Sequence, residues 1–252
     1  MPEALLAWLD TSPGTWLDMN SGTWLGCLAV LALGAFVQRA TGFGLAVVGA
    51  PLLLMLEPRL VPVILVVFGF TVALTTLRHY WHEVRLAEIG TALVGRVPGN
   101  ALGLWLLLAA PMAVLEKLIA GSVLFAVAVT LFRFRLPVNR ATLFGAGVFS
   151  GIFGTVAALS GPPLVLLLHG FSPDRLRGTL SAFFVVTALM TLATLGLGGL
   201  LRAWHFGMAL TFAPGVLAGS WLASRVAHRL DRRLLQGASL ALCTMAALAL
   251  LV

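Results

Sequence analysis

The chain has 252 residues, of which 60% are hydrophobic and 10% are charged. Soluble domains contain roughly half apolar and a quarter charged residues, so this composition excludes an ordinary water-soluble domain and a disordered chain. Apolar blocks of nearly membrane-spanning length recur throughout and predict an all-α polytopic membrane protein. The net charge of +7 does not indicate nucleic-acid binding, because most basic residues lie in short loops between these blocks.

The N-terminal segment, residues 1–22, contains Glu3, Asp10 and Asp18 but no lysine or arginine. It therefore lacks the basic region of a signal peptide. Its leucines and tryptophans are typical of a stretch that lies at a membrane interface. We expect an interfacial segment on the outer, periplasmic side.

Ten apolar blocks follow, at 23–38, 43–56, 60–77, 86–109, 112–132, 141–156, 161–169, 179–200, 204–224 and 234–252. A membrane span requires about 20 helical residues, and six of the blocks are predicted to cross. The other four form two pairs, each interrupted by a polar, glycine-rich turn segment at 38–44 or 154–163. Each pair could enter the membrane, turn near the midplane and leave on the same side. The alternative is one long kinked helix for each pair.

An internal repeat relates the two halves of the chain. Residues 98–105 (PGNALGLW) match residues 214–221 (PGVLAGSW) at an offset of 116 residues. Three further pairs share an offset of 112: Gly42 with Gly154, Gly49 with Gly161, and Pro51 with Pro163. We therefore predict two transmembrane repeats, 23–135 and 140–252, each a broken or re-entrant helical hairpin followed by three transmembrane helices.

Arginines in the loops predict the orientation. With re-entrant pairs and an outer N-terminus, eleven arginines gather on the cytoplasmic side: Arg78, Arg85, Arg133, Arg135, Arg140, Arg175, Arg177, Arg225, Arg229, Arg232 and Arg233. The outside receives only Arg59, Lys117 and Arg202. This asymmetry agrees with the positive-inside rule, whereas pairs that cross once would scatter the charge. Three crossings in each repeat make the second repeat inverted, as in many secondary transporters, and both termini periplasmic.

Two arginines lie outside these loops. Arg39 belongs to the first turn segment, near the midplane, and Arg96 lies about ten residues into the block 86–109. A guanidinium at that depth requires water, a partner charge or a ligand. The nine acidic residues lie in loops or in the N-terminal segment, apart from Glu88 near the cytoplasmic end of its helix. We expect a transported anion to supply the missing charge; the alternatives are snorkelling and pairing with carbonyl groups.

The turn segments strengthen the prediction of an anion site. The second half-helix of each hairpin would begin near the midplane, and helix N-termini bind anions. Thr41 could cap the first, while Ser160 with Pro162 suits the second. The glycines would let the backbone approach a ligand, although they could serve only helix packing. The predicted substrate-binding residues are Arg39, Thr41, Gly42, Gly44, Arg96, Asn100, Gly154, Ser160 and Gly161.

We expect no catalytic residue, cofactor or metal. Cys27 and Cys243 lie in apolar stretches without CxxC or Cys/His spacing and are predicted to be packing residues. The sequence contains no G-x-x-x-x-G-K-[ST] motif, so it does not support ATP hydrolysis. A coupling ion, H⁺ or Na⁺, or a partner would then supply the energy. Among the histidines, His169 at the end of the second hairpin could titrate.

The sequences TGFGLAVVGAPLLL and GIFGTVAALSGPPLVLLL, with the repeated PGxxxGxW, resemble the sulfite exporter TauE/SafE family over about 24–250. The resemblance implies a secondary transporter, exporter or permease, of small sulfur-containing or organic anions such as sulfite, sulfonates or sulfoacetate in the bacterial inner membrane. Its partners would be the anion, the lipid bilayer and the coupling ion, without nucleic acid; a homodimer stays open. The first turn segment reads Gly42-Phe43-Gly44-Leu45 and lacks a further glycine that many members have, so substrate and direction are not carried over.

Two other classes remain as alternatives. A structural subunit of a larger membrane complex would pair its buried arginines with carboxylates of a partner. An intramembrane serine protease would use Ser160 with a histidine base at the same depth. This second alternative is weaker, because His169 lies at the far end of its half-helix and His205 lies beside the interfacial residues Arg202 and Trp204.

Overall fold

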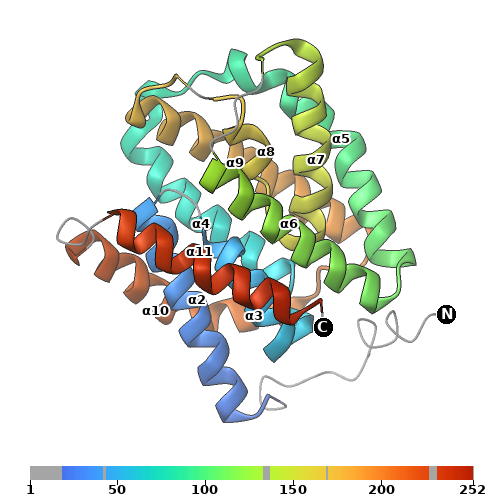
Figure 1. The fold of residues 1–252 in the computed structure, drawn as a ribbon. Coiled ribbons are helices and arrows are strands. Elements are labelled where there is room, and N and C mark those ends of the chain that lie inside the picture. Colours follow the sequence, from blue (N-terminus) through green and yellow to red (C-terminus); the bar gives the residue numbers. More distant parts are fainter. Residues whose placement is uncertain (1–18, 42–43, 133–136, 169, 227–231, 252) are drawn as a thin grey trace.

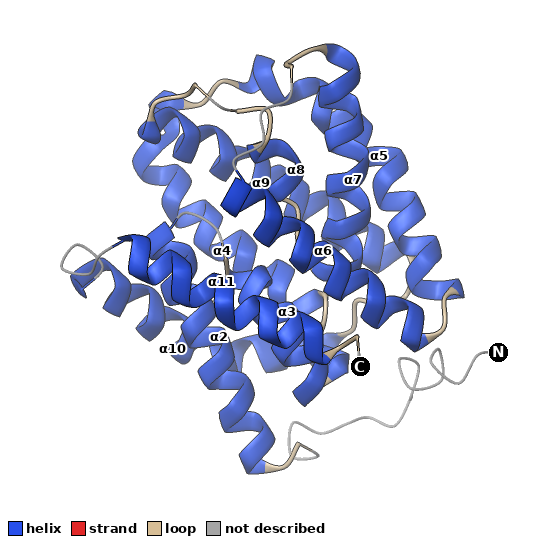
Figure 2. Ribbon diagram, in the orientation of Figure 1, coloured by secondary structure: helices blue, strands red, loops and turns tan. Residues whose placement is uncertain are grey.

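The computed structural model describes residues 19–41, 44–132, 137–168, 170–226 and 232–251 (Figure 1). Figure 2 shows only helices and loops in these ranges, which confirms the predicted all-α fold class. Seven of the described helices are long and apolar enough to cross a membrane: α2 (Ser21–Thr41), α4 (Val63–Tyr80), α5 (Leu86–Ala109), α6 (Met112–Phe132), α7 (Arg140–Ala157), α9 (Pro173–Leu197) and α10 (Ala203–Val226).

The remaining elements are shorter or less apolar along their length. They are α3 (Leu45–Leu56), α8 (Pro162–Val165) and α11 (Arg232–Ala249), with single turns of 3₁₀-helix at η1 (Pro58–Leu60) and η2 (Trp81–Glu83). The predicted N-terminal interfacial segment lies almost entirely outside the described residues, as does His169.

The first member of each predicted short pair is longer than its apolar block. α2 has 21 residues and α7 has 18, so the expectation that both are too short to cross is wrong. Polar residues at the helix ends explain the difference. Asn139 and Thr142 form a capping box at the start of α7, with the Asn139 side chain accepting from the Thr142 amide at 2.9 Å. Such caps extend a helix beyond the block that hydropathy detects.

Both predicted pairs reverse direction as hairpins. α2 and α3 are antiparallel, since Gly34 packs against Leu45 and Gly26 against Leu56. α7 ends at Ala157, and the C-cap residue Ala158 adopts a left-handed conformation with φ 59°.

The second hairpin departs from the prediction after its turn. The half-helix expected over 161–169 is too long, because the α-helix covers only Pro162–Val165. The chain continues as irregular turns, with the Leu168 amide donating to the Leu164 carbonyl at 3.2 Å. Gly170, at φ 92°, has a backbone conformation that glycine tolerates best.

The repeated glycine motif produces close helix packing in both halves. α5 lies parallel to α7, because Gly95 faces the Phe144 backbone and, one turn later, Gly99 faces that of Val148. α10 lies parallel to α2 in the same way (Figure 1), with these contacts: Gly215 against Leu28 and Gly219 against Ala32. A β-carbon at Gly99 or Gly219 would overlap the facing backbone. Small residues thus allow the close approach of membrane helices.

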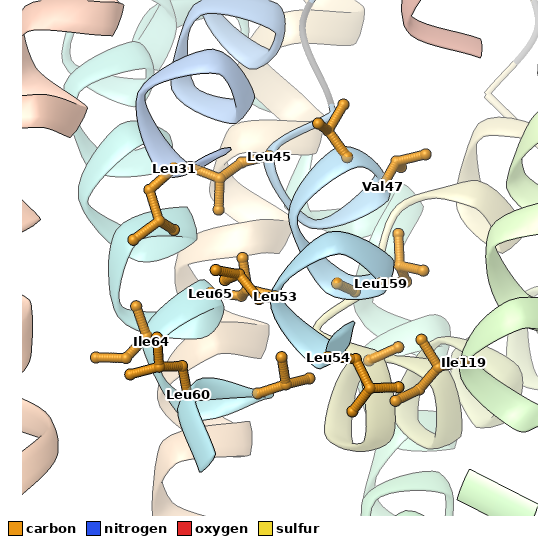
Figure 3. Packing of buried hydrophobic residues seen from close by; sticks show 14 of the residues in the cluster. Leu31, Leu45, Val47, Leu53, Leu54, Leu60, Ile64, Leu65, Ile119 and Leu159 are labelled. Atoms are coloured by element: carbon orange, nitrogen blue, oxygen red, sulfur yellow. The ribbon is translucent and has the colours of Figure 1, made fainter. Parts of the chain in front are cut away.

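Leucine side chains pack on both sides of α3. Figure 3 shows Leu53 beside Leu65 of α4, and Leu54 near Ile119 of α6, and all four are buried. The first hairpin therefore inserts α3 into the interior of the bundle. The same core contains both cysteines, free and buried, which confirms their predicted packing role.

Candidate functional site

A cavity of about 70 Å³ lies where the two hairpins meet. The first hairpin contributes Gln38 and residues 44–47, and the second contributes residues 158–162. The walls come from α4, at residues 65, 66, 69 and 70, and from α9, at residues 184, 187, 188 and 191. The structure thus brings the two predicted turn segments together at one place, beside the N-terminal half of α4 and the middle of α9.

Arg96 of α5 is fully buried behind this cavity. Its Nη1 donates to the carbonyl and to the hydroxyl of Ser150, both at 2.7 Å. Its Nη2 donates to Ser160 Oγ at 3.0 Å and to Thr191 Oγ1 at 2.8 Å, and lies 3.5 Å from the Thr187 carbonyl. The guanidinium therefore joins α5 to α7, to the second turn segment and to α9.

Every one of these acceptors is electrically neutral. Within the described ranges, the ion pairs lie elsewhere and join Arg59 with Glu57 and Arg177 with Asp174. Carbonyl and hydroxyl dipoles stabilise a guanidinium but leave its net charge in place. Arg96 therefore places a positive charge, without a carboxylate partner among the described residues, directly behind the cavity.

Gly154 provides the space that the Arg96 side chain occupies. A β-carbon at this position would overlap Arg96 Nη2 and lie 3.0 Å from Arg96 Cζ. It would also lie 2.5 Å from the Ser160 hydroxyl oxygen. A residue larger than glycine would therefore displace the guanidinium. The role of Gly154 is thus to leave space for the Arg96 side chain as well as to allow helix packing.

The expected helix caps are corrected by the structure. The N-cap of α3 is Gly44, at φ 145°, and the Leu45 amide donates to Gln38 Oε1 at 3.2 Å. The N-cap of α8 is Gly161, which has no side-chain capping bond, and the Ser160 hydroxyl accepts from Arg96 instead. Pro162 does begin α8, as predicted.

The other predicted site residues lie at different distances from the cavity. Gly44, Ser160 and Gly161 line it. Asn100 is buried one turn beyond Arg96, where its Nδ2 donates to Thr194 Oγ1 at 3.1 Å. Arg39 is half-buried in the last turn of α2, next to Gln38. Gly42 and the side chain of Thr41 fall outside the described part of the chain.

Four polar residues at the site were not among the predicted residues: Gln38, Ser150, Thr187 and Thr191. Gln38 could have been identified from the sequence, because a carboxamide interrupts an apolar block beside Arg39. The sequence does not distinguish the serine and the two threonines from other residues of their helices. Membrane helices commonly contain such residues, whose hydroxyls bond their own helix backbone.

The histidine contacts bear on the serine protease alternative. Ser160 Oγ is bonded to Arg96 rather than to a histidine among the described residues. His205 lies near η1, where its Nδ1 accepts from the Arg202 amide at 3.2 Å and its Nε2 lies 3.3 Å from the Arg59 carbonyl. His205 therefore has other partners than Ser160.

Seven described helices that are long and apolar enough to cross a membrane, packed around a mostly apolar cavity with a buried guanidinium behind it, indicate a multi-pass membrane protein. The profile of the family described as Sulfite exporter TauE/SafE matches residues 27–250, most of the chain. The chain belongs to this family, whose members are membrane transporters of sulfur anions such as sulfite. No curated protein and no solved structure matches the chain.

Proposed function

We propose that this protein is a secondary transporter that moves a small sulfur oxyanion such as sulfite across the bacterial inner membrane. The anion would bind in the cavity between the two hairpins. The observation that carries this proposal is Arg96, which is fully buried beside the cavity and has only neutral partners among the described residues. A buried charge without a counter-ion is costly in a membrane, and a bound anion removes that cost.

The size of the cavity supports a small ligand. A volume of about 70 Å³ corresponds to about five water molecules, at about 10–15 Å³ for each. An anion of the size of sulfite fits this volume.

The directions of the helices support two inverted repeats over 23–135 and 140–252. The sequence repeat makes α4 the counterpart of α9, and a twofold axis in the membrane plane would make counterparts antiparallel. The C-terminal end of α4 and the N-terminal end of α9 meet where Gly178 packs against the Tyr80 carbonyl. In addition, α5 of the first repeat contacts α7 of the second. In the same way α10, the counterpart of α5, contacts α2, the counterpart of α7.

The turn segments lie beside the N-terminal half of α4 and the middle of α9, inside the helical bundle, which supports re-entrant hairpins. Periplasmic termini are proposed from the distribution of arginines between the loops. Opening of one hairpin at a time would expose the cavity to one side of the membrane and then to the other. The remaining predicted binding residues, Arg39, Thr41, Gly42 and Asn100, would contribute around this site. The coupling ion, the direction of transport and a homodimer stay open within this proposal.

The first test is stabilisation of the purified protein by anions. Sodium sulfite, sulfoacetate, taurine and chloride are added separately, and the unfolding temperature is measured for the parent, Arg96→Gln and the surface control Arg177→Gln. We expect sulfite to raise the unfolding temperature of the parent and of the control, but not of Arg96→Gln. No response of the parent to any of these anions would reject the transporter proposal and favour the structural subunit.

A further inference from the structure

We infer that the hydroxyl groups of Thr191 and Ser160 hold the anion, and that Arg96 acts behind them as a positioning residue that directs their hydrogens into the cavity. This inference rests on the proposed function. It assigns Thr191 as a ligand-binding residue and removes Arg96 from direct contact with the substrate.

The chemistry of the guanidinium fixes the direction of its hydrogen bonds to the two hydroxyls. Arg96 Nη2 lies 2.8 Å from Thr191 Oγ1 and 3.0 Å from Ser160 Oγ. A guanidinium has donors and no acceptor, so both hydroxyl oxygens must accept. Each hydroxyl therefore keeps its own hydrogen for another partner.

The Thr191 hydroxyl does not donate to the backbone carbonyl that usually accepts from a threonine in a helix. Thr194, one turn later in α9, donates to the Met190 carbonyl at 2.8 Å, as helical threonines commonly do. The corresponding carbonyl for Thr191 is that of Thr187, which lies 3.5 Å from Arg96 Nη2. Within the described residues, neither Thr191 nor Ser160 donates its hydroxyl hydrogen to a protein acceptor.

The Ser150 hydroxyl belongs to the same network but both accepts and donates a hydrogen bond. It accepts from Arg96 Nη1 at 2.7 Å and donates to the Ser160 carbonyl at 2.7 Å. Ser150 does not line the cavity, whereas Thr191 and Ser160 do. Thr187 also lines the cavity, but its hydroxyl donates to the Phe184 carbonyl at 3.3 Å. Among the described hydroxyls of the cavity lining, those of Thr191 and Ser160 are therefore the two that keep a hydrogen for a ligand.

The charge of Arg96 strengthens these two donors. A hydroxyl that accepts a bond from a cation becomes a stronger donor, because hydrogen bonds in a chain polarise one another. Gln38 adds a third donor from the opposite hairpin, since its Oε1 is occupied by the Leu45 amide and only its Nε2 remains. Donors from both hairpins match an oxyanion with several acceptor oxygens.

The test uses sodium sulfite and calorimetry on purified variants. Thr191→Val and Ser160→Ala each remove a hydroxyl, while Thr191→Ser keeps one. The matched controls are Thr244→Val and Ser122→Ala, whose hydroxyls donate to their own helices at Leu240 and Ile119. We expect each removal to weaken sulfite binding about ten- to a hundredfold. We expect Thr191→Ser to stay within about threefold of the parent, and the controls to be unchanged.

The outcomes separate this inference from the proposed function. If the parent binds sulfite and both removals leave affinity unchanged while Arg96→Gln abolishes it, Arg96 contacts the anion directly and the inference is overturned. A loss in Thr191→Ser as large as in Thr191→Val would also overturn it, because the methyl group would then matter rather than the hydroxyl. If Thr191→Val does not fold, Ser160→Ala decides alone. A parent that binds no sulfite would overturn both the inference and the proposed function.

Discussion

Substitution of Gly154 by alanine adds one methyl group beside the guanidinium of Arg96. Its β-carbon would overlap Arg96 Nη2 and lie 2.5 Å from Ser160 Oγ. The guanidinium cannot simply move away, because Ser150 and Thr191 hold it at 2.7 and 2.8 Å. Overpacking of this kind destabilises a protein by about 1–3 kcal/mol, and loss of a bond to a charged group by about 1.5–3 kcal/mol. Alanine recovers about 0.5–1 kcal/mol through its helix preference.

The expected net loss is therefore about 1.5–5.5 kcal/mol. Each kcal/mol corresponds to an unfolding temperature lower by roughly 2–4 °C in a chain of this size. Gly121→Ala is the control, since nothing lies within 4 Å of a β-carbon there. The assay is thermal unfolding with and without sulfite at equal protein abundance. Gly154→Ala should lose both stability and the sulfite response, and Gly121→Ala neither. Equal losses in the two variants would refute the reasoning.

Three further predictions concern Arg39, Gln38 and the membrane orientation. Arg39→Gln should abolish sulfite binding in calorimetry while the protein stays folded, with partial recovery in Arg39→Lys, which keeps the charge but not the planar fork; unchanged affinity would return Arg39 to a structural role. Gln38→Glu keeps an acceptor for the Leu45 amide but adds negative charge to the cavity, so sulfite affinity should fall more than tenfold, and equal affinity would contradict the cavity as the site. With periplasmic termini, Ser172→Cys should be protected from an impermeant thiol reagent in intact cells, whereas a cysteine at Lys117 should react; the reverse pattern would rule out re-entrant hairpins.

The sequence predicted the elements that depend on local patterns. Hydropathy identified the helical class, and the positive charge of Arg96 inside an apolar block pointed to the interior. The hairpin turns were found because glycine and polar residues interrupt apolar blocks there. These features are visible along the chain without knowledge of what packs against them.

The features that the sequence did not predict depend on contacts between distant segments. Thr191 resembles any helical threonine until α5 brings Arg96 to within 2.8 Å of its hydroxyl. Ser160 looked like a cap because it precedes Pro162, yet the distant guanidinium takes its oxygen. The length of α2 was underestimated, since its polar last turn continues the helix up to Thr41.

In the proposed function, an anion crosses the membrane through the cavity beside the buried charge of Arg96. Sulfite flux into proteoliposomes, driven by a sulfite gradient and measured at alkaline pH for the parent and for Arg96→Gln at equal incorporation, tests it most directly. The parent should show saturable flux above that of empty liposomes, and Arg96→Gln should show none. A parent flux equal to that of empty liposomes, or an Arg96→Gln flux equal to that of the parent, would contradict it.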